Sequence, residues 1–221
     1  MNGLPTIQKP AEEIKNTPKF VYDKRSGRYR YLDTGKFVSK EAVTYLTRKN
    51  INLVQQELDL IRDQTIAGKI TLTEFQAITA RNLKSLHIQQ SILARGGAAN
   101  FTSADRLRVS ETLRAENERL AGIARNLVDG NLSKAQFAAQ YNTFAKKSQV
   151  SFEESVLQNN IDNGLVAMRR FLGATDKHCA SCLRYAARGM QPIGTLPLPM
   201  RACECRSNCK CRVVYYRSFS P

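Results

Sequence analysis

The order of apolar and polar positions along the 221-residue chain predicts a mainly α-helical protein. Through the middle of the sequence, apolar residues recur every three or four positions, which places them on one face of a helix. The first such stretch follows Ser39, a hydroxyl residue suited to cap a helix, and Gly68 is suited to end it. Its expected buried positions are Val43, Leu46, Val54, Leu58 and Ile61.

Two more helices follow from the same signals. Thr71 and Glu74 fit a capping box at the start of a helix expected over about residues 72–94. Thr102 or Ser103 is expected to cap the next helix. The expected buried positions are Phe75, Ile78, Leu83, Leu86 and Leu93 in the second helix, and Leu107, Leu113, Leu120, Ile123 and Leu127 in the third.

A fourth helix is expected to begin after Ser133 and to continue, with a break near residues 159–164, as far as Phe171. Its start repeats the start of the second helix. The segment Gly68-Lys69-Ile70-Thr71 followed by Phe75 matches Gly130-Asn131-Leu132-Ser133 followed by Phe137. Either two helical hairpins of similar size or independent use of good turn chemistry explains the match. The predicted body of the protein, residues 39–171, is therefore an elongated helical bundle.

The N-terminal region has a different pattern. Residues 1–18 are polar and contain three prolines, which predicts a flexible arm. Residues 19–38 alternate aromatic and basic side chains and contain two turn signals, which predicts a short β-hairpin or meander. One interpretation is that these side chains contact bases and phosphates, and the other is a strand with a packed aromatic face and a solvated basic face. The candidate nucleic-acid-binding residues are Lys24, Arg25, Arg28, Arg30 and Lys36.

All six cysteines lie in the C-terminal region, residues 172–221, between positions 179 and 211. Cys179 and Cys182 form a CxxC pair, a spacing at which two thiolates can bind one zinc ion. Zinc needs two more ligands, and Cys205, Cys209 and Cys211 compete for these places. Cys203 is expected to be the spare cysteine, and His178 is an alternate ligand.

Disulfides and free thiols remain alternatives to the metal, since six cysteines allow fifteen pairings. A reducing cytosol favours zinc over disulfides, and no secretory signal is recognisable at the N-terminus. The run from Arg212 to Tyr216 predicts a short strand. We therefore expect a zinc knuckle with a β-hairpin, in which a structural zinc ion supplies stability that a small apolar core cannot.

The charge distribution narrows the choice of partner. The chain has 34 basic and 19 acidic residues, a net charge of +15. The first fifty residues carry +6 and the last twenty-one carry +4, so the two ends hold most of the excess. An anionic partner is expected, such as DNA or an acidic protein surface. No apolar run is long enough for a membrane span, so no membrane partner is expected.

The cysteine-rich region resembles the C-terminal signature of the head-morphogenesis proteins of tailed phages, the Mu F-like minor head protein family. The matching segments are His178-Cys179-Ala180-Ser181-Cys182-Leu183, Ala186 with Gly189, Leu196-Pro197, and Cys205-Arg206-Ser207-Asn208-Cys209-Lys210-Cys211-Arg212. Lys210 stands where the family usually has arginine. Cys205 stands near a position where many members have histidine, which favours a role as a metal ligand. The resemblance extends to Tyr29–Ser39 at the N-terminal end, and more loosely to the helices, where it includes Leu86-His87 and Gly96-Gly97.

The resemblance implies a structural component of the virion that acts in capsid assembly. Its expected partners are the portal protein, the major capsid protein and packaged double-stranded DNA, and it is a possible homo-oligomer in the phage head. The alternative is a sequence-independent DNA-binding protein with a zinc knuckle. An enzyme is not expected, because the chain has only two histidines and no recognisable cluster of acidic residues.

Overall fold

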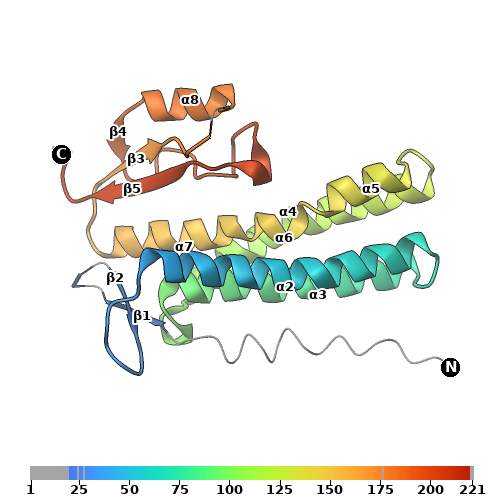
Figure 1. The fold of residues 1–221 in the computed structure, drawn as a ribbon, viewed down its shortest axis with the longest axis horizontal. Helices are drawn as coiled ribbons and strands as arrows, with labels where there is room; N and C mark the ends of the chain where they lie inside the picture. Colours follow the sequence, from blue (N-terminus) through green and yellow to red (C-terminus); the bar gives the residue numbers. More distant parts are fainter. Residues whose placement is uncertain (1–19, 24, 27, 176, 220–221) are drawn as a thin grey trace.

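The computed structural model describes residues 20–23, 25–26, 28–175 and 177–219, so the predicted arm and Lys24 lie outside the described residues. The protein is mainly helical, with a short N-terminal hairpin and a C-terminal region that contains the cysteines (Figure 1). The elements are β1 (Phe20–Asp23), β2 (Arg28–Tyr31), α2 (Lys40–Ile66), α3 (Leu72–Arg95), η1 (Ala98–Asn100), α4 (Ser103–Val128), α5 (Lys134–Tyr141), α6 (Phe144–Lys147), α7 (Gln149–Asp162), β3 (Ala167–Phe171), α8 (Ala180–Ala187), β4 (Met190–Pro192), η2 (Arg206–Asn208) and β5 (Arg212–Tyr216).

The predicted hairpin is present. Strands β1 and β2 pair antiparallel, with Phe20 opposite Tyr31. Their aromatic side chains pack inward against the ends of α2 and α3, where Phe20 joins Val43 and Leu93 in one apolar cluster. Gly96 permits this contact, since a Cβ there would lie 2.1 Å from the backbone nitrogen of Tyr22.

The predicted helix starts are confirmed. The side chains of Ser39, Thr71, Thr102 and Ser133 each accept a hydrogen bond from a backbone N–H in the first turn of the following helix. The last three form full capping boxes, in which the third helical residue bonds back to the cap. Each cap satisfies backbone donors that a helix start leaves without partners.

The two similar turns meet in the main core of the helices. Phe75 and Phe137, which occupy matching positions after the two turns, are both fully buried, and their ring centroids lie 5.6 Å apart. Tyr141 packs on both rings and shares a 2.7 Å hydrogen bond with Thr79. The repeated turn chemistry therefore brings the ends of two helical hairpins together around one aromatic cluster.

One expected core position is wrong. Leu107 is 62% exposed, whereas Val109 of the same helix is buried. At 100° per residue, Leu107 lies about 120° around the helix from Leu113, while Val109 lies about 40° from it. Val109 therefore belongs to the buried face of α4, and Leu107 does not.

A row of polar side-chain pairs joins α3 to α7. His87 Nδ1 lies 2.8 Å from Ser151 Oγ, and Ser91 pairs with Ser155 one turn further on. The Arg95 guanidinium then donates to Asn159 over 2.7 Å and to Asp105 of α4 over 2.9 Å. These side chains are buried, so each must find its partner inside the protein.

The prediction that the fourth helix reaches Phe171 is wrong. Two shorter helices, α5 and α6, precede α7, which ends at Asp162. Residues 167–171 form strand β3, which pairs antiparallel with both β4 and β5. The expected β-hairpin is therefore a three-stranded sheet, and β3 belongs with the cysteines rather than with the helices. None of the helices in the described part of the chain is long and apolar enough to span a membrane.

Candidate metal centre

The cysteines come from two segments that the sheet brings together. Cys179 occupies the N-cap position of α8, without a capping bond from its side chain, and Cys182 lies in the first turn of this helix. The other four lie in the irregular segment between β4 and β5, which includes η2. Strand β3 lies between β4 and β5 and fixes both segments relative to each other. None of the six cysteines forms a disulfide.

Four of the sulfurs form a compact group. The Sγ atoms of Cys182, Cys203, Cys205 and Cys209 all lie within 4.8 Å of one another. Cys182 Sγ lies 3.5 Å from Cys205 Sγ and 3.8 Å from Cys209 Sγ, and Cys203 Sγ lies 3.4 Å from Cys205 Sγ. Four thiolates around a zinc ion, with Zn–S bonds of about 2.3 Å, lie about 3.8 Å apart. A disulfide would need about 2.05 Å, so the spacing suits a shared metal ion.

The compact group and the expected ligand set share three members, Cys182, Cys205 and Cys209. Cys203, expected as the spare, lies in the group and is buried. Cys179 and Cys211 are partly buried and pack against it from outside. Cys203-x-Cys205 and Cys209-x-Cys211 have the same spacing in the sequence. Spacing alone therefore did not distinguish the cysteines of the compact group from Cys179 and Cys211.

Arg170, which the sequence reasoning missed, lies against this sulfur group. Its side chain is 1% exposed, and one terminal nitrogen donates to Cys182 Sγ over 3.4 Å and to Cys209 Sγ over 3.2 Å. The other terminal nitrogen donates to the carbonyl of Pro197 over 2.9 Å. Burial opposes its charge, but the negative charge of nearby cysteine sulfurs more than compensates, so the pKa of Arg170 is raised.

The surroundings also act on the cysteines. A hydrogen bond with Ser181 lowers the pKa of Cys179 to about 6. Burial raises the pKa of Cys209, but backbone N–H groups of Cys211 and Met200 oppose it and bring this pKa down to about 7. Burial raises the pKa of Cys182. A metal ion would displace the proton from each ligand, because zinc binds the thiolate form.

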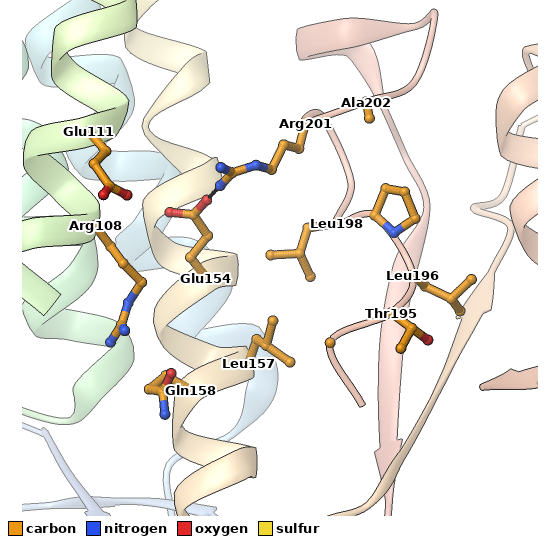
Figure 2. A pocket seen from close by; sticks show the side chains of 12 residues that line it. Arg108, Glu111, Glu154, Leu157, Gln158, Thr195, Leu196, Leu198, Arg201 and Ala202 are labelled. Atoms are coloured by element: carbon orange, nitrogen blue, oxygen red, sulfur yellow. Dashed lines mark ion pairs between the residues drawn. The ribbon is translucent and has the colours of Figure 1, made fainter. Parts of the chain in front are cut away.

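An ion pair joins the segment before the cysteine group to the helices. Figure 2 shows Arg201 reaching from the loop toward Glu154 of α7, with which it forms an ion pair. Glu154 is 9% exposed and Arg201 is 57% exposed, so the pair lies at the edge of a buried contact. Beside it, a cleft of about 490 Å³ separates α7 from the loop and is lined by Leu157, Leu196 and Leu198, among others. The ion pair thereby links the loop before the cysteine group to α7.

The candidate nucleic-acid-binding residues are held in different ways. Arg25 and Lys36 are exposed. The guanidinium groups of Arg28 and Arg30 lie 4.1 and 3.9 Å from the ring centroid of Phe37. Arg30 also forms a 2.7 Å ion pair with Asp23, so its positive charge is paired within the hairpin. The inward packing of the tyrosines agrees with a strand that has one packed aromatic face and one basic face.

The comparisons with known proteins identify no relative. No known protein family, no curated protein and no solved structure matches the chain.

Proposed function

We propose that this protein is a metal-stapled structural component of a phage head, a minor head protein that acts in capsid assembly. The observation that supports a structural metal is the compact group of four cysteine sulfurs beside Arg170. The phage assignment rests on the resemblance of the cysteine-rich segment to the Mu F-like family. In this proposal, an elongated helical bundle carries a zinc knuckle and contacts portal, capsid or packaged DNA.

In this proposal Cys182, Cys203, Cys205 and Cys209 hold the zinc ion. Bound zinc supplies folding free energy and no chemistry on a substrate. The four thiolates carry four negative charges against the two positive charges of zinc, and the buried Arg170 guanidinium offsets part of the excess. Cys179 and Cys211 then remain as outer cysteines that line the site.

A structural role agrees with the burial of the one histidine–serine pair that an enzyme could use among the described residues. His87 lies within hydrogen-bonding distance of Ser151, a pair of residue types that some hydrolases use. Both are at most 1% exposed between α3 and α7, so no substrate reaches them in this conformation. Burial lowers the pKa of His87 to about 4, and the neutral ring suits a packed position.

The metal is tested by elemental analysis of the full-length protein purified without added zinc or chelator. We expect about one zinc ion per chain, and a Cys209→Ser variant should hold less than half of that. Cys179→Ser is the matched control, because it removes a cysteine outside the compact group and should keep the metal. Wild-type protein without metal, or equal loss in both variants, would contradict the proposed ligand set.

The phage role is tested separately by locating the chain in purified particles. We expect it to co-purify with portal or capsid protein and to occur in few copies per particle. The alternative, a sequence-independent DNA-binding protein, is favoured by the net charge of +15. It predicts salt-dependent binding of duplex DNA by the isolated protein, with a smaller salt slope after removal of residues 1–38. Absence from particles combined with such binding would favour the alternative.

A further inference from the structure

The basic N-terminal and C-terminal parts of the chain meet at one groove. This groove has a volume of about 930 Å³ and lies between the N-terminal hairpin, α2, the start of α7 and the segment of residues 199–215. Five exposed basic side chains line the groove, namely Arg28, Arg48, Lys146, Lys210 and Arg212.

Apolar side chains line much of the groove between these basic residues, beside several uncharged polar ones. Val38 and Val43 are buried at its base. Half-buried apolar side chains from α2, α7 and the C-terminal segment complete it, namely Ile51, Phe152, Val156, Met200 and Val213. The hydroxyl group of Tyr215, another lining residue, is buried and has no hydrogen-bond partner among the described residues. The groove therefore offers an apolar surface, an unused polar group and a basic rim.

The excess of positive charge distinguishes this groove from the cleft on the other side of α7. Among the described residues that line the groove, Glu153 is the one acidic side chain, and it already has an interaction within the protein. The cleft on the other side of α7 differs, because Arg108 and Arg201 are balanced there by two glutamates (Figure 2). A ligand of the basic groove gains most if it carries several negative charges.

We propose that this groove binds an acidic, amphipathic segment of a partner protein. Apolar side chains of such a segment fit the base of the groove, and its carboxylates face the basic rim. Duplex DNA supplies negative charge for the basic rim but no apolar group for the bottom of the groove. It therefore accounts for the basic residues of the lining and not for the apolar ones. The wall from Val43 to Asn52 is about 14 Å long, which suits two to three turns of helix.

This inference deepens the proposed assembly role and rests on it for its biological setting. Its test uses the full-length protein and needs no virion, so the groove inference and the proposed assembly role can each fail without the other. The probe is a fluorescent 14-residue peptide with leucine at helical spacing and glutamate elsewhere, measured by anisotropy. Three comparison probes are the same peptide with glutamine for glutamate, a permuted peptide of equal composition, and a 14-base-pair DNA duplex.

We expect the acidic amphipathic peptide to bind at least tenfold more tightly than the glutamine and permuted peptides. Arg48→Glu combined with Lys146→Glu should weaken it at least tenfold, because four units of charge change at the rim. Lys69→Glu combined with Arg81→Glu is the matched control, at exposed positions outside the groove, and should change binding less than twofold. Circular dichroism and zinc content confirm that each variant is folded.

Three results would overturn the inference. The first is no peptide binding up to about 1 mM, which corresponds to a negligible affinity. The second is equal weakening by the groove and control variants, which would show nonspecific charge attraction. The third is duplex binding that depends on Arg48 and Lys146 while peptide binding does not, which would assign the groove to DNA. Arg48→Gln with Lys146→Gln repeats the test if charge reversal disturbs folding.

Discussion

The helical region and the cysteine region are held together by different chemistry. The helices bury a large cluster of aromatic and aliphatic side chains, with Phe75, Phe137 and Phe144 fully enclosed. In the cysteine region, the apolar cluster has only three buried members, Met168, Leu196 and Leu198, and the second cluster consists of cysteines. The largest fully buried side chain of the whole described chain, Arg170, lies there. Apolar burial stabilises the first region, and in the proposed function the second depends on a metal ion held by its sulfurs.

Metal removal should separate the two regions most strongly. A chelator in reducing buffer should open residues 177–219 to limited proteolysis and leave α2 to α7 protected. Structural zinc sites contribute about 10–16 kcal/mol to folding, more than any other interaction considered in this protein. Mass spectrometry of the fragments measures the effect. An unaltered digestion pattern after complete zinc removal would show that both regions are stabilised alike.

The reverse experiment removes apolar packing from the helices. Phe75→Ala should lower the free energy of unfolding of the helical region by about 3–5 kcal/mol, because it leaves a cavity in a fully buried position. Chemical denaturation followed by circular dichroism measures this change. Leu60→Ala is the control at a 64% exposed position and should cost less than about 0.5 kcal/mol. Zinc content should stay constant in both variants.

Acid should weaken the helical region through His87. Burial lowers the pKa of His87 to about 4, while an unfolded histidine titrates near 6.5. Between these values the unfolded state binds more protons, so the free energy of unfolding falls as the pH is lowered from 6.5 to 4. The full effect is about 3 kcal/mol. A His87→Gln variant should show a shallower pH dependence in this window, and an unchanged slope would contradict the assignment.

A smaller effect is expected from Arg170→Met in the cysteine region. Methionine keeps much of the side-chain volume but removes the two contacts to Cys182 and Cys209. Loss of a group that supports metal ligands typically weakens metal binding about 10–100-fold. Competition with a chromophoric zinc chelator measures this affinity. Arg170→Lys keeps the charge and should lose less, whereas equal loss in both variants would point to packing instead.

The helices were predictable because their signals are local. Ser39, Thr71, Thr102 and Ser133 cap helices through contacts within one turn, and the sequence shows these contacts directly. Burial followed from helical periodicity except at Leu107, which lies off the buried face of its helix. The N-terminal hairpin was predictable for the same reason, because its two strands are joined by a short turn.

The cysteine region was predictable only in outline. The clustering of cysteines indicated a metal site, but strand β3 is fixed by its partners β4 and β5, which lie further along the chain. Its apolar residues therefore looked like the end of a helix. Arg170 has no motif of its own, because its role comes from burial against Cys182 and Cys209. Cys203 differs from Cys211 only through tertiary position.

The contacts between α3 and α7 also set an order for folding during synthesis. His87 with Ser151, Ser91 with Ser155, and Arg95 with Asn159 each join residues 64 positions apart. A nascent chain that ends near residue 140 already contains the α2–α3 hairpin but none of these three partners. The polar side of α3 must stay hydrated until α7 leaves the ribosome, and all three pairs then form in a single register. A shift of α7 by one turn would change the partner in each of these three pairs.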